Sequence, residues 1–225
     1  MYIQTTTRCN MRCGHCIYSC TSVGEDMAMD IFKATIDGGQ GENKVACLAG
    51  GEPTLHPRFW DMVEVALGAN YQGVWVSTNG SRTDDTLRLA KMAKDGILSC
   101  QLSRSQYHAD IDQEVVDAFD GCPEDFLDSH SRKWTDGSAG QGLDLRMVSG
   151  YIPAANIIGL GRAARIPGTR RYCKMDNDYV VDVRGVIHRC FCKDSEVLGH
   201  VFEHPVIPSG NCTGSKTTHY EKAIV

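Results

Sequence analysis

The sequence predicts an α/β fold, namely a partial (βα)6 TIM-like barrel with a small cysteine-rich β-hairpin extension at its C-terminal end. Three observations predict this fold: apolar or β-branched runs alternate with amphipathic stretches, the links between them are short, and the alternation stops after about six units. An eight-unit barrel typically needs about 250 residues, more than the 225 of this chain. We expect the barrel over residues 1–165 and the extension over residues 166–225.

The elements of the first half are predicted from two periodicities. Runs of apolar and β-branched residues indicate strands, and apolar residues that recur every three or four positions indicate helices. Gly38 and Gly39 mark the end of the first helix. In chain order the elements are a strand at 2–7, a helix at 28–36, a strand at 44–49, a helix at 58–67, a strand at 73–77, a helix at 84–94, a strand at 97–102 and a helix at 113–119. This order predicts a parallel sheet with right-handed crossovers, whose C-terminal strand ends collect the chemistry.

The second half is less regular. Residues 121–142 form a turn-rich segment that is longer than a typical connection, and the sequence favours neither a substrate loop nor a plain surface excursion. Strands at 143–148 and 155–160 would complete the six units. Two apolar runs at 179–183 and 186–188 flank an Arg-Gly turn and predict a hairpin.

Composition indicates an ordinary soluble protein. The chain is 42% hydrophobic and 23% charged, and its net charge of −5 gives no reason to expect a polyanionic partner. Its first residues lack the basic start and apolar core of an export signal, and no apolar run approaches the roughly 20 residues that cross a bilayer. We therefore expect a cytoplasmic protein without a membrane partner.

Eleven cysteines are many for this length, and their odd number argues against a disulfide framework. Cys9, Cys13 and Cys16 stand in one short loop directly after the first strand. A structural zinc site usually fills four positions, whereas three thiolates in a tight loop suit three corners of a cubic iron-sulfur cluster. The fourth iron is then open to a small ligand, so the loop predicts a reactive cofactor. Three buried or zinc-binding thiols are the alternative.

The Cys-x3-Cys-x2-Cys loop resembles the signature loop of the radical S-adenosylmethionine (radical SAM) enzymes. His15, immediately before the third cysteine, matches the form found in members that modify peptides and amino-acid-derived substrates. The resemblance implies a 4Fe-4S cluster on Cys9, Cys13 and Cys16 that binds S-adenosylmethionine, with His15 in the cofactor site. It also implies a barrel that is incompletely closed on the substrate side.

A second motif follows the second predicted strand. Gly50 and Gly51 precede Glu52 and Pro53, and a glycine pair allows close approach to the backbone. In the radical SAM family the corresponding segment binds the amino group of the methionine part of the cofactor. The resemblance therefore implies that Gly50, Gly51 and Glu52 bind the cofactor; a plain strand-to-helix turn is the alternative.

Polar residues at the ends of the third and fourth strands complete the expected cofactor site. The resemblance places Ser77 and Asn79 near the ribose or the methionine carboxylate, although Asn-Gly is also a common turn. Ser103 and Arg104 are expected partners of a carboxylate, since a guanidinium holds one by two hydrogen bonds. The segment departs from the family pattern at Ser105, where an acid usually stands. His108 and the catalytic residues are left unassigned.

The C-terminal cysteines predict a second metal site. Cys173, Gly185 and Cys190 have the spacing that opens the auxiliary-cluster extensions called SPASM and twitch domains, which the segment resembles. Cys192 and Cys212 bring the number of thiols to four, enough to ligate an auxiliary iron-sulfur cluster or a zinc ion. The full seven-cysteine SPASM pattern is absent, so a shortened, single-cluster version is expected.

The resemblance implies an enzyme that reductively cleaves S-adenosylmethionine to a 5′-deoxyadenosyl radical and abstracts hydrogen from carbon to modify or rearrange an amino-acid or peptide-like substrate. An electron donor such as flavodoxin or ferredoxin is the implied partner. Two alternatives stay open. A basic stretch from Arg162 to Lys174 encourages a nucleotide or an amino-acid-decorated nucleobase as substrate, and a non-catalytic iron-sulfur or zinc-binding protein is the other possibility.

Overall fold

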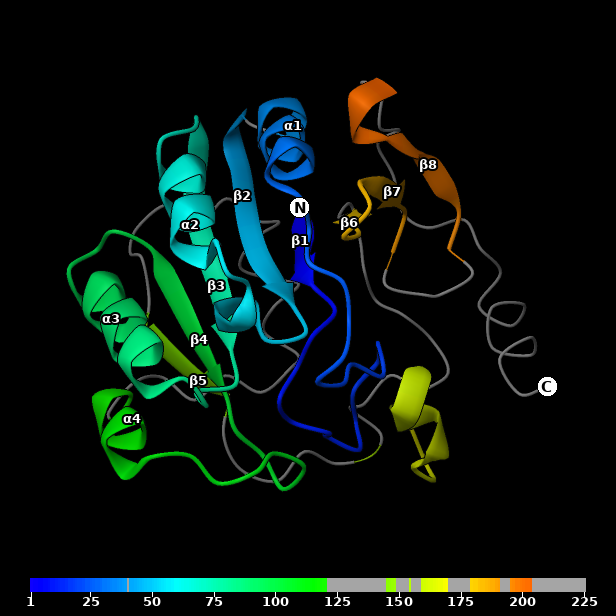
Figure 1. Ribbon diagram of the computed structural model, residues 1–225. Helices are drawn as coiled ribbons and strands as arrows, with labels where there is room; N and C mark the ends of the chain where they lie inside the picture. Colours follow the sequence, from blue (N-terminus) through cyan, green and yellow to red (C-terminus); the bar gives the residue numbers. More distant parts are fainter. Residues whose placement is uncertain are drawn as a thin grey trace.

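The structure is a computed structural model, and it describes residues 1–39, 41–120, 145–148, 154, 159–169, 179–190 and 195–203. Strands and helices alternate through the first part of the chain (Figure 1). In order they are β1 (Tyr2–Thr6), α1 (Met29–Gly39), β2 (Gly41–Gly50), the 3-10 helix η1 (Pro53–Leu55), α2 (Phe59–Leu67), β3 (Tyr71–Thr78), α3 (Thr83–Lys94), β4 (Ser99–Ser103), α4 (Gln113–Ala118), β5 (Leu145–Val148), the 3-10 helix η4 (Gly161–Arg165), β6 (Val180–Val181), β7 (Val186–His188), β8 (Val197–His200) and the 3-10 helix η5 (Val201–Glu203).

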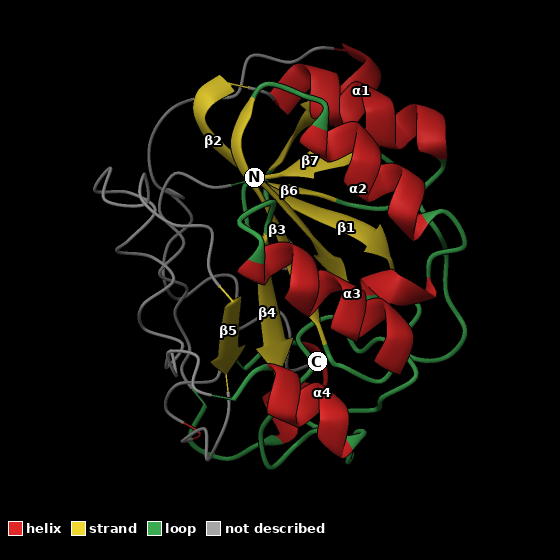
Figure 2. Ribbon diagram, turned by 90° about the vertical axis from the view of Figure 1, so that its left-hand side faces the viewer, coloured by secondary structure: helices red, strands yellow, loops and turns green. Residues whose placement is uncertain are grey.

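The strands form one sheet in the order β5-β4-β3-β2-β1-β6-β7-β8, and β1 to β5 are parallel neighbours in sequence order. Sequential order with right-handed crossovers places successive helices on one face of a sheet. Figure 2 shows α1 to α4 on one face of the sheet. The predicted α/β fold with a mostly parallel sheet is confirmed. Closure of a barrel is not seen, since β5 and β8 are the edges of the sheet in the described part of the chain.

Both faces of the central strands are buried. All residues of β4 from Ser99 to Leu102 are buried, as are three successive residues of β3, Val74–Val76. The helices contribute residues at helical spacing, for example Phe59, Met62, Val63 and Ala66 of α2. This core fixes the strand register and therefore the positions of the loops at the strand ends.

One prediction for the second half meets a different outcome. Gly159 and Leu160 are not in a strand, and the rest of the predicted strand 155–160 lies outside the described residues. Instead, β6 pairs in parallel with β1, and β7 pairs antiparallel with both β6 and β8. These strands continue the sheet from the free edge of β1. No described helix is long and apolar enough to cross a membrane.

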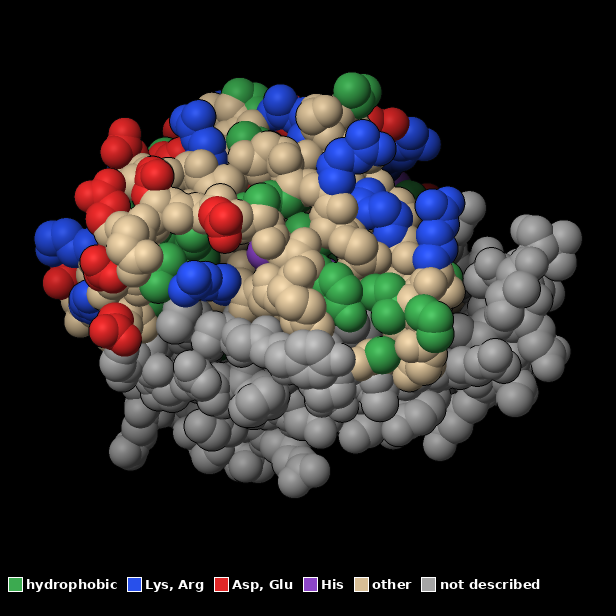
Figure 3. All heavy atoms as spheres, turned by 90° about the horizontal axis from the view of Figure 1, so that it is seen from below, with side chains coloured by type: hydrophobic (Ala, Val, Ile, Leu, Met, Phe, Trp, Pro, Cys, Tyr) green, Lys and Arg blue, Asp and Glu red, His purple; other side chains and the backbone are tan. Residues whose placement is uncertain are grey.

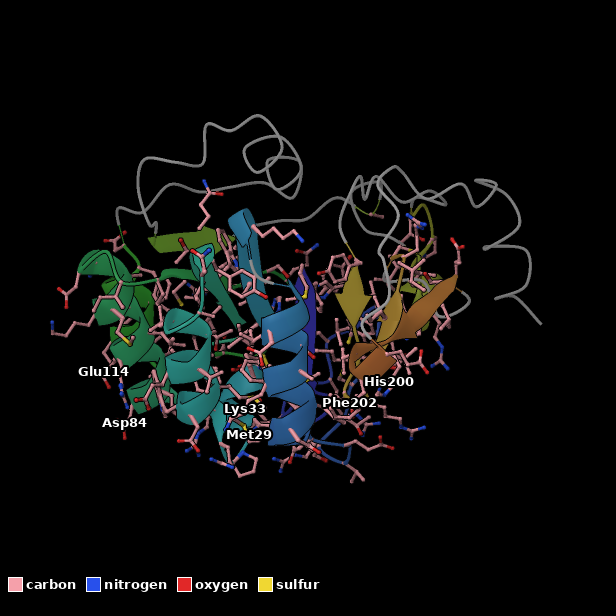
Figure 4. All side chains as sticks on the ribbon, turned by 90° about the horizontal axis from the view of Figure 1, so that it is seen from above. Met29, Lys33, Asp84, Glu114, His200 and Phe202 are labelled. Atoms are coloured by element: carbon pink, nitrogen blue, oxygen red, sulfur yellow. The ribbon has the colours of Figure 1, made fainter. Side chains whose placement is uncertain are left out.

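The β6–β7 turn packs against α1 and η5. Figure 4 shows α1, which carries Met29 and Lys33, beside β8 and η5, which carry His200 and Phe202. Gly185 has a φ of +83° and accepts this contact because it lacks a side chain. A Cβ there would lie 2.9 Å from Val201 Cγ2 and 3.0 Å from Ile31 Cγ2.

We expect Gly185→Ala to lower the free energy of unfolding by about 1–2 kcal/mol, the cost of a left-handed conformation for a residue with a Cβ. Gly38→Ala is the matched control, because Gly38 lies in α1 with nothing within 4 Å of an added Cβ. There alanine is favoured by about 0.5–1 kcal/mol. Urea unfolding followed by circular dichroism measures both, and equal stabilities of the two variants would contradict the packing described.

Candidate functional site

The predicted site residues come from loops at the C-terminal ends of β1, β2, β3 and β4. Because these strands are parallel, their ends meet at one edge of the sheet, the lower edge in Figure 1. Figure 3 looks at the molecule from this end and shows acidic side chains mainly toward the left and basic side chains on both sides. The structure thus brings together residues that are far apart in the sequence.

The cysteine loop leaves β1 and is closed on itself by backbone hydrogen bonds. The Cys9 N–H donates to the Thr21 carbonyl at 2.6 Å, and the Cys16 N–H donates to the Cys13 carbonyl at 3.2 Å. Cys9, Cys13 and Cys16 are all half-buried. The loop therefore holds three partly shielded thiols on a short, closed stretch of backbone.

The electrostatics of the three thiols suit a cationic group. Burial raises the pKa of Cys9, and burial together with neighbouring Cys9 and Cys16 raises the pKa of Cys13 to about 11. A hydrogen bond with the Cys20 thiol lowers the pKa of Cys16 to about 6 and raises that of Cys20. Iron bound to the three sulfurs would remove the repulsion between neighbouring thiolates.

The arrangement also bears on which metal group fits. Among the described residues, no three side chains of His, Cys, Asp or Glu are gathered so that they could hold a single metal ion. A closed zinc site takes four ligands, whereas the loop offers three thiols, the number expected for a cubic cluster with one open iron.

The glycine pair at the end of β2 is required by the close packing of the protein's own backbone. Gly50 has a φ of +132°, and a Cβ on it would lie 2.4 Å from the Thr6 carbonyl oxygen. A Cβ on Gly51 would lie 2.0 Å from the Arg8 carbonyl oxygen, one residue before Cys9. The pair thus allows the end of β2 to pack against the start of the cysteine loop.

The Glu52 carboxylate is buried, with 1% of the residue exposed, and its described partners are groups of the protein. Oε1 accepts from Thr54 Oγ1 at 2.7 Å, from the Thr54 N–H at 3.2 Å and from Thr78 Oγ1 at 2.8 Å, while Oε2 accepts from the Asn79 N–H at 2.7 Å. Burial raises the pKa of Glu52 despite these donors. The side chain therefore joins η1 to the end of β3, and its expected contact with the cofactor stays a prediction.

Asn79 connects this junction to the first thiol. Its Nδ2 lies 3.7 Å from Cys9 Sγ and donates to Asn10 Oδ1 at 3.2 Å, and its Oδ1 accepts from the Ser81 N–H at 2.9 Å. Ser77, two residues earlier in β3, is half-buried. Of the two residues expected at the end of this strand, Asn79 is the one in contact with the cysteine loop.

Aromatic and histidine rings from the loop after β4 pack on the cysteine loop. The His15 ring centroid lies 4.9 Å from that of Tyr107 and 4.9 Å from that of His108. Burial lowers the pKa of His15, and burial and His15 lower that of His108 to about 4. Both rings are therefore neutral at neutral pH. His15 Nδ1 is buried and has no hydrogen-bond partner in the described part of the chain.

Ser105, where the sequence departs from the family pattern that it resembles, contacts the ring of His108. Its N–H donates to His108 Nδ1 at 3.0 Å, and its Oγ lies 2.9 Å from the same nitrogen. A nitrogen that accepts from a backbone N–H is unprotonated, so the proton of neutral His108 is on Nε2. Ser103 is half-buried at the end of β4 and Arg104 is exposed, and their expected contact with a carboxylate stays a prediction.

The C-terminal cysteines are described only in part. Cys190, two residues beyond β7, is buried, and its N–H donates to Ser195 Oγ at 2.9 Å. Cys173, Cys192 and Cys212 lie outside the described residues.

Two residues at this site were not assigned to it from the sequence. Cys20 follows Cys16 with three residues between them, a spacing that could have linked it to the loop. Arg162 contacts the cysteine loop from 142 residues after Cys20, and no local pattern could have linked the two.

We expect Glu52→Gln to lower the free energy of unfolding of the cluster-free protein by about 1–3 kcal/mol, because the amide NH2 would face a donor in a buried site. Glu64→Gln on the exposed face of α2 is the control and should be neutral. Urea unfolding of both variants measures the difference. A wild-type stability for Glu52→Gln would contradict the structural role of the carboxylate.

Residues 3–103 match the sequence model of the Radical SAM superfamily. Among curated proteins, the tungsten-containing aldehyde ferredoxin oxidoreductase cofactor-modifying protein of Pyrococcus furiosus is 36% identical over 101 residues, which are 43% of this chain and 28% of that protein. The mycofactocin maturase MftC of Mycobacterium ulcerans is 28% identical over 126 residues, 50% of this chain and 30% of that protein. The matched region thus spans less than a third of these relatives.

Solved structures share the fold. The structure of BtrN in complex with AdoMet and 2-DOIA has a TM-score of 0.56 at 16% identity and covers 90% of this chain and 77% of its own. Native anSMEcpe with bound AdoMet and Cp18Cys peptide has a TM-score of 0.52 at 14% identity, covering 89% and 76%. The family match covers residues 3–103, which are less than half of the chain and include the cysteine loop, and the likeness to these solved structures is one of fold.

Proposed function

We propose that the protein is a radical SAM enzyme that reductively cleaves S-adenosylmethionine and abstracts hydrogen from carbon to modify a peptide or amino-acid-like substrate. Cys9, Cys13 and Cys16 would hold the 4Fe-4S cluster. When bound, the cluster supplies the electron that cleaves S-adenosylmethionine into methionine and a 5′-deoxyadenosyl radical, which takes the hydrogen atom.

One observation carries this proposal: the cysteine loop and the Gly50-Gly51-Glu52 turn pack directly against each other. The Glu52 N–H donates to the Arg8 carbonyl at 2.8 Å and the Gly51 N–H donates to the Thr6 carbonyl at 2.7 Å. A group bound at the thiols would therefore lie close to this turn. That proximity is what a sulfonium cofactor requires, since it must contact the open iron and be held by its methionine part at once.

The substrate class rests on relatives. The anSMEcpe structure contains a bound peptide, and MftC is named a maturase. The rings of His15, Tyr107 and His108 form an aromatic wall against the cysteine loop. We therefore favour a peptide or amino-acid-like group over a phosphorylated one.

The described residues do not strengthen the nucleotide alternative. It was motivated by the basic stretch that starts at Arg162, but the Arg162 guanidinium donates to carbonyls of the cysteine loop. The other basic residues of the stretch are Arg165, which is exposed, and Arg170, Arg171 and Lys174, which lie outside the described residues.

We also propose that Cys173, Cys190, Cys192 and Cys212 ligate a second iron-sulfur cluster in a SPASM- or twitch-like extension over residues 166–225. Burial of Cys190 next to β7 supports this assignment, because the hairpin would carry that thiol at one end. A flavodoxin or ferredoxin as electron donor and a cytoplasmic location stay predictions.

Anaerobic reconstitution with iron and sulfide, followed by dithionite and S-adenosylmethionine, is expected to release 5′-deoxyadenosine, detected by mass spectrometry. Single alanine variants of Cys9, Cys13 and Cys16 are expected to release none, because each removes a cluster ligand. Cys100→Ala is the control, since Cys100 is buried in β4 within the apolar core. Failure of a cluster-loaded wild type to release the product would refute the proposed reaction. A peptide that accelerates release would support the substrate class, whereas acceleration by nucleosides alone would overturn it.

Iron counting tests the second cluster. Two 4Fe-4S clusters correspond to about eight iron atoms per chain, and a variant with Cys9, Cys13 and Cys16 all changed to alanine should retain about four. Cys190→Ala in that background should remove the rest. A triple variant that binds no iron would contradict a second cluster.

A further inference from the structure

The 3-10 helix η4, distant in sequence, is hydrogen-bonded to the backbone of the cysteine loop. Arg162, in η4, donates to three carbonyls of that loop: its N–H to Cys16 at 3.0 Å, its Nε to Cys13 at 3.0 Å and its Nη1 to Cys20 at 2.8 Å. In Figure 1, η4 is the yellow helix without a label, near the lower edge of the molecule. One residue thus ties together three successive points of the loop.

Gly161 allows this approach. It has a φ of +54°, and a Cβ on it would lie 2.3 Å from the Ile17 carbonyl oxygen and 2.8 Å from the Cys16 carbonyl oxygen. Any side chain would push η4 away from the loop, since the atoms that it meets belong to the backbone. The contact is therefore built between two backbones and not merely between side-chain tips.

The turn is anchored on its other side. Ala163 is fully buried, and Tyr107 and Ile166 pack against it. Tyr107 in turn contacts the His15 ring. The turn that carries Arg162 is thus positioned by packing of residues other than the thiols.

The guanidinium also places a positive charge beside the thiols. Arginine stays protonated at any physiological pH. Nη2 is buried without a hydrogen-bond partner in the part of the chain that the structure describes. The Nη2 group of the guanidinium can therefore donate to a ligand or an anionic group at the site.

We propose that Arg162 is a positioning residue for the cluster, which shapes the cysteine loop before iron binds and stabilises the reduced cluster by its charge. The first part rests on the three hydrogen bonds to carbonyls, and the second on proximity of a fixed cation to thiolates that gain negative charge on reduction. The second part rests on the proposed function, because it requires that the bound group is a redox cluster. The first part does not.

Two variants separate the two effects. Arg162→Lys keeps the charge but replaces the planar guanidinium with a single ammonium, so it loses most of the side-chain hydrogen bonds to the cysteine loop. Arg162→Gln removes the charge and keeps one short amide donor. Arg165→Gln, an exposed arginine in the same 3-10 helix, is the matched control.

Hydrogen-deuterium exchange of the cluster-free protein tests these hydrogen bonds. Loss of hydrogen bonds from a charged donor should speed exchange of peptides covering residues 13–20 roughly tenfold or more in both Arg162 variants. Peptides from α3 should exchange as in the wild type, which also shows that the variants fold. Unchanged exchange in the loop of a folded Arg162→Gln variant would overturn the proposal, and a variant that fails to fold leaves Arg162→Lys to decide it.

Redox titration of the reconstituted protein tests the charge, using the electron paramagnetic resonance signal that responds to S-adenosylmethionine. The midpoint potential should become more negative in Arg162→Gln and stay near the wild type in Arg162→Lys and Arg165→Gln. A wild-type potential in Arg162→Gln would overturn the electrostatic part. A wild type that binds no cluster would instead refute the proposed function, while the exchange result would still stand.

Discussion

The site depends on the hydrogen bonds that the buried carboxylate of Glu52 accepts. It accepts from Thr54, Thr78 and the backbone of Asn79, and so joins the ends of β2 and β3. Each of these donors would be left unsatisfied without it, at a cost of about 1–3 kcal/mol apiece. Because Asn79 in turn contacts Cys9 and Asn10, the geometry of the first thiol is set by a network that begins in the core.

The cysteine loop is held from two sides by parts of the chain that are distant in sequence. Its start is held by the segment after β2, through the close packing of the glycine pair and through the hydrogen bond from the Glu52 N–H to the Arg8 carbonyl. Arg162 holds its middle and its end. A loop of this length has few contacts of its own, so its conformation must come from such neighbours. This explains why a short motif needs a whole domain around it to bind a cofactor.

The C-terminal strands are part of the same sheet. β6 pairs with β1 in parallel, and so covers an edge that would otherwise expose unpaired backbone groups. The turn between β6 and β7 then packs on α1 through Gly185. Cys190 therefore follows a strand that shares the sheet carrying the cysteine loop. Any metal site that includes this thiol would be linked to the cofactor site through continuous backbone hydrogen bonding.

The sequence by itself determined the alternation of elements, the parallel sheet and the cysteine loop, because hydrophobic periodicity and short motif spacing are local properties. It also identified the segment of Glu52 and Asn79. Only the tertiary structure decided that the Glu52 carboxylate accepts hydrogen bonds from the protein's own donors. It also decided that Gly51 lets the Arg8 carbonyl approach closely, and that Arg162 donates hydrogen bonds to carbonyls of the cysteine loop. Those facts depend on contacts between residues widely separated along the chain, which no local pattern encodes.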